Sequence, residues 1–175
     1  MSLIRCFVAA DLPAEVRAEI AALEDRLRSR KLDLRWVTSS SLHLTLKFLG
    51  EISPEVFEKI WRALEEPLGV PAPLRLRLAG VGAFPSVRRA RVAWVGLGGD
   101  IAALARAALT IEARAEGAGI PREVRPFAPH LTVGRVRGPA GASNLERALQ
   151  EEADFKGSVF EVRSLVLYES QLRPG

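Results

Sequence analysis

The chain contains two histidines, and both open the same four-residue pattern of histidine, leucine, threonine and an apolar residue. The copies are HLTL at residues 43–46 and HLTV at residues 130–133, about half a chain length apart. Because the chain has only four threonines, a given histidine would find one two places later by chance in roughly 2% of cases. The duplication therefore indicates function, and its spacing predicts two similar lobes with one copy each.

Each copy falls in a predicted strand, in which residues two apart point to the same face. His43 and Thr45 should share one face, and His130 and Thr132 another, while the intervening apolar residues pack into the core. If the two strands face each other, they enclose two imidazoles and two hydroxyls. A neutral imidazole can take a proton from a nucleophile while an imidazolium protonates a leaving oxygen. The hydroxyls can donate hydrogen bonds to phosphate oxygens, so we expect chemistry on a phosphodiester.

Two other interpretations apply to such histidines. An isolated copy of the pattern would most simply be a structural histidine, but the duplication argues against that interpretation. A zinc or iron site needs more ligands than two histidines, and neither strand has a neighbouring carboxylate or an HExxH motif. We therefore expect neither a metal nor any other cofactor.

The elements that must position these residues alternate between strands and helices. Strands are predicted at residues 4–10, 32–37, 42–49, 74–78, 90–97, 130–136, 155–160 and 162–169. Helices are predicted at about residues 13–30, 54–64, 101–116 and 143–152, with Asp11, Ser53, Asp100 and Ser143 as capping residues. Residues 80–85 are predicted to form a loop. This order favours an α+β fold with mainly antiparallel sheets.

Composition limits the class of protein. The 175 residues suit a single domain, and the formal net charge of +4 is consistent with an anionic partner. Arginine supplies 21 of the 25 basic residues, which fits phosphate recognition but equally a bias in genome base composition. One cysteine excludes an internal disulfide. With no evident signal peptide and no run of about 18 apolar residues, we expect a cytoplasmic monomer that does not enter membranes.

The residues around both copies extend the pattern. HLTLKFLG at residues 43–50 and PFAPHLTVGRV at residues 126–136 resemble the two signature motifs of the two-histidine (2H) phosphoesterase superfamily. Nearly the whole chain is similar to its RNA 2′,3′-cyclic phosphodiesterases, also named 2′-5′ RNA ligases, including RCFVAADLP, RWVTSSSLHLTLKFLGE, GAFPS, RVAWVGL and LVLYES. The resemblance implies a bilobal fold with a pseudo-two-fold axis, in which two antiparallel sheets flank a central cleft and helices cover the outer faces.

The resemblance also implies an activity and its residues. The activity is metal-independent hydrolysis of an RNA terminal 2′,3′-cyclic phosphate to a 2′-phosphomonoester, with reversible ATP-independent 2′-5′ ligation in some members. His43 and His130 are then the catalytic pair, and Thr45 and Thr132 hold the phosphate. We assign His43 as the acid on the departing 3′-oxygen and His130 as the base for water, although the sequence does not fix this direction. RNA ends or 2′,3′-cyclic nucleotides are the expected partners.

Two basic residues follow the motifs. Arg135 stands where the family pattern carries a basic residue, and it is the third candidate for phosphate binding. Strict alternation turns it away from His130, but Gly134 could permit a bulge that brings it back, and a solvated strand-end arginine is the alternative. Lys47 falls on the face of His43 by alternation and is a candidate RNA contact, with simple solvation an equal alternative.

Several aromatic and basic residues near the motifs have weaker assignments. Phe84 and Phe127 flank the motif loops, and either can stack on a terminal base or pack in the core. Three arginines at residues 88–91 can follow phosphates or form a solvated face. We expect Tyr168 to be structural.

Three functions compete. The first is the RNA 2′,3′-cyclic phosphodiesterase, and the second is a 2H enzyme that acts on another cyclic phosphate or on a 2′-5′ diester. The third is a protein that binds RNA ends without turnover. Intact histidines and threonines in both copies favour an enzyme.

Overall fold

Two antiparallel sheets form the framework of the computed structural model, which describes residues 3–170 and, of residues 139–143, the backbone alone. The strands in these residues are β1 (Ile4–Ala10), β2 (Leu34–Trp36), β3 (Leu44–Ile52), β4 (Leu74–Phe84), β5 (Val92–Gly99), β6 (His130–Val136), β7 (Lys156–Val162) and β8 (Val166–Glu169). The predicted α+β class with antiparallel sheets is therefore confirmed.

The strand order interleaves the two halves of the chain. The smaller sheet has the order β3-β1-β8, and the larger sheet has the order β2-β6-β5-β4-β7. Strand β2 comes from the first half but pairs with β6, and the last strand, β8, returns to pair with β1. Each sheet thus contains strands from both halves of the chain.

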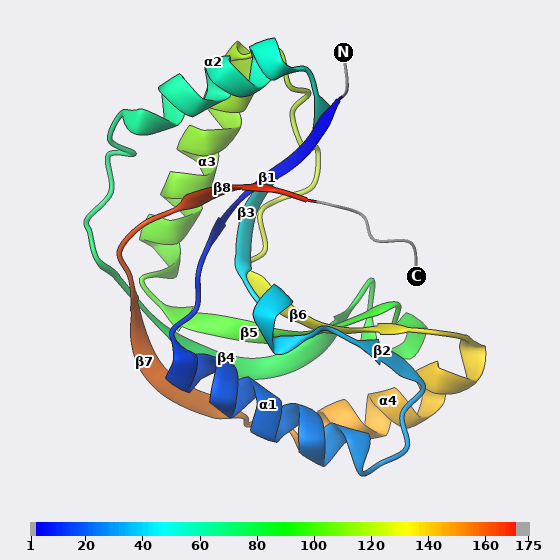
Figure 1. The fold of residues 1–175 in the computed structure, drawn as a ribbon. Helices are drawn as coiled ribbons and strands as arrows, with labels where there is room; N and C mark the ends of the chain where they lie inside the picture. Colours follow the sequence, from blue (N-terminus) through cyan, green and yellow to red (C-terminus); the bar gives the residue numbers. More distant parts are fainter. Residues whose placement is uncertain (1–2, 171–175) are drawn as a thin grey trace.

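Helices cover one side of each sheet. They are α1 (Ala14–Arg28), α2 (Pro54–Glu65), α3 (Ile101–Gly117) and α4 (Pro139–Glu151), with short 3-10 turns η1 (Ser39–Ser41) and η2 (Val87–Arg89). Helix α3 packs on β3 and α2 packs on α3, whereas α1 and α4 lie beneath the larger sheet (Figure 1). Each sheet therefore keeps a helix-free face. Among the described residues, no helix has the length and apolar character needed to cross a membrane.

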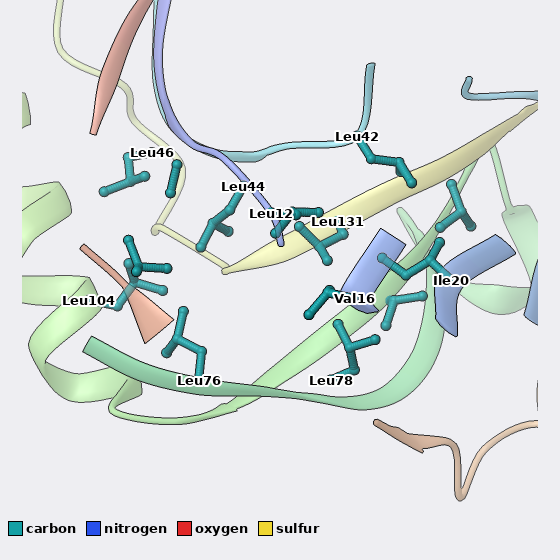
Figure 2. Close-up of a cluster of buried hydrophobic side chains, with 14 of the residues drawn as sticks. Leu12, Val16, Ile20, Leu42, Leu44, Leu46, Leu76, Leu78, Leu104 and Leu131 are labelled. Atoms are coloured by element: carbon teal, nitrogen blue, oxygen red, sulfur yellow. The ribbon is translucent and has the colours of Figure 1, made fainter. Parts of the chain in front are cut away.

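The core joins the two motifs. Leu44 and Leu131, which directly follow the two histidines, are both 0% exposed. They pack with Val16 and Ile20 of α1 in one continuous cluster (Figure 2). Burial of such a leucine contributes about 1.5–3 kcal/mol to stability, so the apolar partners of both histidines fasten the two strands to the same core.

Some boundaries differ from the sequence predictions. Strand β4 continues to Phe84 through the predicted loop at residues 80–85, because Gly80 adopts φ +72° at an irregularity in the strand and lets it bend instead of ending. Helix α4 begins at Pro139 and not at Ser143, since proline is well suited to a first helical turn. Strand β3 begins at Leu44, so His43 lies directly before it.

Candidate active site

The first histidine lies against an aromatic surface. The His43 ring stacks on Phe7 of β1, with ring centroids 4.6 Å apart and an interplanar angle of 27°. Tyr168 of β8 stacks on the same phenylalanine, and its centroid is 5.9 Å from that of His43. Thr45 pairs with Ala9 and is half-buried, like His43, whereas the intervening leucine is fully buried. The predicted alternation of this motif is therefore confirmed.

Charged residues beside this ring affect its protonation. Arg17 of α1 forms an ion pair with Asp11, at 3.6 Å between Nη2 and Oδ1, and donates a hydrogen bond to the Ser39 carbonyl. Burial lowers the pKa of His43, the Arg17 cation lowers it further, and Asp11 acts in the opposite direction. The net effect favours the neutral imidazole.

Two residues here have roles that the sequence did not predict. Asp11 does not cap α1, whose N-cap position is Pro13, but accepts a hydrogen bond from the Tyr168 hydroxyl. Burial, and then the bond to Asp11, raises the pKa of Tyr168 to about 12. Tyr168 therefore remains a hydrogen-bond donor near neutral pH, and it lies beside a candidate catalytic residue.

The second histidine is held by a hydrogen bond. His130 opens β6 opposite Gly96, and its Nδ1 lies 2.7 Å from the carbonyl oxygen of Ala128. A carbonyl only accepts, so this contact assigns the proton to Nδ1 and leaves Nε2 for chemistry. Phe84 packs edge-on against the ring, with centroids 4.8 Å apart. Thr132 is half-buried on the same face, as predicted.

Both motif strands contain a β-bulge directly after the threonine. In β3 the ladder to β1 skips Leu46, and in β6 the ladder to β5 skips Val133. The two residues after each threonine therefore both lie on the side of the sheet that the helices cover, and the next residue returns to the helix-free face. The residue four places after each histidine is covered, and the residue five places after it is open.

The bulge overturns the prediction for Lys47. This side chain does not share the face of His43 but is buried against α3, where Nζ lies 2.6 Å from Glu112 Oε1 and 3.1 Å from the Pro121 carbonyl. Strict alternation fails because Leu46 adds one residue to the strand. Lys47 is thus directed away from the face proposed to contact RNA.

The same geometry returns Arg135 to the face of His130. A bulge is present here, but its extra residue is Val133 and not Gly134, the residue that the sequence suggested could permit one. Arg135 is exposed and lies opposite Val92 on one side and Arg35 on the other.

The equivalent position after His43 is Phe48, which the sequence interpretation missed. It is 65% exposed, and its ring centroid is 6.0 Å from that of Phe7. If a β-bulge had been assumed after the threonine in both copies of the pattern, the sequence would have placed Phe48 on the open face.

The other residues that the sequence suggested as contacts lie in different places. Phe84 contacts His130 as well as Trp94, whereas Phe127 is partly buried and packs against the core. The arginines at residues 88–91 are exposed at and after η2, and Arg88 forms an ion pair with Glu146. No group of three or more histidine, cysteine, aspartate or glutamate residues suited to a metal ion occurs in the part of the chain that the structure describes.

Known protein sequences are similar to this chain over nearly its whole length. The chain matches the family model described as LigT like Phosphoesterase over residues 10–94 and 97–175. An RNA 2′,3′-cyclic phosphodiesterase from Methanocaldococcus jannaschii is 30% identical over 171 residues, covering 98% of this chain and 94% of the relative. One from Thermus thermophilus is 35% identical over 142 residues, covering 78% of this chain and 71% of the relative.

Solved structures share the architecture. The crystal structure of TT0787 from Thermus thermophilus has a TM-score of 0.78 at 29% identity, covering 98% of this chain and 91% of that one. E. coli LigT complexed with 3′-AMP has a TM-score of 0.76 at 26% identity, covering 99% of this chain and 90% of that one. From its sequence match and its fold, this chain belongs to the LigT-like phosphoesterase family.

Proposed function

We propose that the chain hydrolyses the 2′,3′-cyclic phosphate at the 3′ end of RNA to a 2′-phosphomonoester. The observation that carries the proposal is the pair of histidine–threonine motifs on helix-free faces of two strands that share one core. The relatives named RNA 2′,3′-cyclic phosphodiesterase support the substrate class. E. coli LigT has been solved in complex with 3′-AMP, which supports nucleotide binding by a protein of this fold.

A single substrate contacting both motifs is consistent with the packing. Strand β3 contacts β6, and Leu44 and Leu131 lie close together in the core (Figure 2). Because the histidines adjoin these two leucines and are only half-buried, they project from neighbouring segments. We therefore assign them to one reaction and not to two independent sites.

The reaction is an in-line displacement at phosphorus. His130 accepts a proton from water at Nε2, and the water oxygen bonds to phosphorus. The bond from phosphorus to the 3′-oxygen breaks, and His43 protonates the departing oxygen. Thr45 and Thr132 donate hydrogen bonds to the non-bridging oxygens, and Arg135 offsets their negative charge. The phosphate remains on the 2′-oxygen.

The charges around His43 affect whether it can act as the acid in this reaction. As the acid, His43 must carry a proton, which burial and Arg17 disfavour. A phosphate anion bound beside the ring acts in the opposite sense, because it favours the imidazolium. In the free enzyme, kcat/KM should therefore decline as the pH rises through the lowered pKa of His43. Ligation of a 5′-hydroxyl to the cyclic end follows the same course, with the hydroxyl in place of water and each histidine in the same role. The two histidines exchange roles only when a 2′-5′ diester is cleaved back to the cyclic phosphate.

A substrate panel in EDTA tests the proposal. The panel contains a nucleoside 2′,3′-cyclic phosphate, an RNA with a 2′,3′-cyclic end, ADP-ribose 1″,2″-cyclic phosphate and a 2′-5′-linked dinucleotide. We expect the first two to be opened to 2′-phosphates, as identified by phosphorus NMR. Preferred turnover of either of the last two substrates would reassign the substrate. RNA binding without any turnover would show that the protein is not an enzyme.

A further inference from the structure

Two arginines lie directly opposite each other on the edge of the larger sheet. Arg35 of β2 pairs with Arg135 of β6 in the antiparallel ladder, and both side chains are exposed. β2 is the edge strand of this sheet. Solvent therefore reaches the pair from the open edge as well as from the face above it.

The flanking residues identify which face the pair occupies. Leu34 is buried, and the guanidinium carbon of Arg28 of α1 lies 4.9 Å from the ring centroid of Trp36. Leu34 and Trp36 therefore face the helices, and Arg35 between them points to the helix-free face. Along β6, the open-face residues are His130, Thr132 and then Arg135, so Arg35 lies beside the last residue of the proposed catalytic row, one strand nearer the edge.

This arrangement concentrates uncompensated positive charge. Like charges directly opposite in an antiparallel pair are destabilising. Among the described residues, no carboxylate lies within 4.0 Å of either guanidinium, whereas many of the other arginines have such a partner. An anion bound between or beside the two guanidiniums would relieve the repulsion. Guanidinium groups are well matched to phosphate oxygens.

We propose that Arg35 binds the internucleotide phosphate next to the reacting end, so that the site recognises an RNA strand in addition to its terminal nucleotide. This inference rests on the proposed function. Arg135 contacts the reacting phosphate, and the RNA strand continues across from β6 to the open edge at β2. Arg35 takes no part in proton transfer. It distinguishes oligonucleotides, which have an internucleotide phosphate, from mononucleotides, which have none.

The test compares two substrates in the same variants. The substrates are adenosine 2′,3′-cyclic monophosphate and a five-nucleotide RNA ending in a 2′,3′-cyclic phosphate. Loss of one charge-assisted hydrogen bond predicts that Arg35→Gln lowers kcat/KM for the RNA roughly tenfold, with the mononucleotide value within about twofold of wild type. Arg35→Lys keeps the charge and should give an intermediate value. Arg106→Gln removes one charge from an exposed position on α3 and serves as the matched control.

Salt dependence gives a second readout that a purely structural role would not change. A plot of log kcat/KM for the RNA against log salt concentration should become shallower by about 0.7 in Arg35→Gln, as expected for one lost phosphate contact on a single strand. Equal losses on both substrates, no loss on the RNA, or the same loss in Arg106→Gln would each overturn the proposal.

A binding measurement separates this inference from the proposed function. If the wild-type protein opens neither substrate, the proposed function fails. Binding of the five-nucleotide RNA with a terminal 2′-phosphate, compared with binding of 2′-AMP, then decides the role of Arg35. We expect Arg35→Gln to weaken binding of the RNA roughly tenfold and to leave the binding of 2′-AMP unchanged. Equal RNA affinities in wild type and variant would overturn the inference.

Discussion

His43 and His130 belong to the same four-residue pattern, but the molecule fixes their rings by different means. His43 is stacked on Phe7, half-buried, and close to the charges of Arg17 and Asp11. His130 donates from Nδ1 to the Ala128 carbonyl, and Phe84 meets it edge-on. Acid–base catalysis on one phosphodiester needs one protonated and one neutral imidazole at the same time. Different surroundings for the same side chain are one way to distinguish these roles.

The residues after each motif show the same contrast. Each strand bulges at the same place, so the fourth residue after the histidine is covered and the fifth is open. The covered residue is Lys47 in the first motif and Gly134 in the second, and the open residue is Phe48 or Arg135. A repeated backbone geometry thus presents an aromatic ring on one side and a cation on the other.

The largest expected effect comes from removing either imidazole. His43→Ala and His130→Ala should each lower kcat on a 2′,3′-cyclic nucleotide by about 10²–10⁴-fold, because each removes one proton transfer. The double variant should lose little more than either single variant, since the two groups act as a unit. Wild-type turnover in either single variant would refute the paired scheme, and circular dichroism spectra would confirm that the variants are folded.

Substitutions at the two covered positions, Lys47 and Gly134, should differ strongly in their effect on the stability of the protein. Lys47→Met leaves Glu112 partly buried without its ion-pair partner, and should lower the free energy of unfolding by about 2–4 kcal/mol. The double variant Lys47→Met/Glu112→Leu should recover much of that loss. Gly134→Ala, at the matched position, should change stability by less than about 1 kcal/mol, since the added Cβ approaches the flexible Leu34 side chain at 3.4 Å. Urea unfolding measures all three variants, and equal losses at the two positions would contradict the contrast.

A smaller effect is expected at the threonines. Thr45→Val and Thr132→Val keep the branched shape but remove a hydrogen-bond donor to the phosphate, and each should lower kcat/KM about 10–100-fold. Thr110→Val on α3, which removes a hydroxyl bonded only to backbone carbonyls in the described residues, is the control and should retain wild-type kinetics. If Thr45→Val and Thr132→Val both behave like the control, the threonines do not hold the phosphate.

Periodicity predicted much of this arrangement. The α+β class, the strands around both motifs and the alternation of half-buried His43 with buried Leu44 all follow from local patterns. The bulges do not, because an inserted residue leaves no mark in a period-two pattern, and Lys47 was therefore assigned to the wrong face. Tyr168 lies beside His43, and Arg35 lies opposite Arg135, because of strand pairings between distant parts of the chain, and local patterns do not determine such pairings.

The most direct measurement of the central claim, that His43 is the acid and His130 the base, is the pH dependence of kcat/KM for a 2′,3′-cyclic nucleotide in Arg17→Gln. The wild-type profile should be bell-shaped, reporting the coupled pair. Removing the Arg17 cation raises the pKa of His43 toward its ordinary value, so more of the acid remains protonated at alkaline pH.

Our account predicts that Arg17→Gln exceeds wild type once the pH rises above the lowered pKa of His43, and equals it at low pH, where His43 is already protonated. Arg17→Lys, which keeps the charge, should follow wild type throughout. A loss confined to acidic pH, with equal rates at alkaline pH, would instead show that His43 is the base. A rate independent of pH between about 5 and 9 would contradict histidine catalysis altogether.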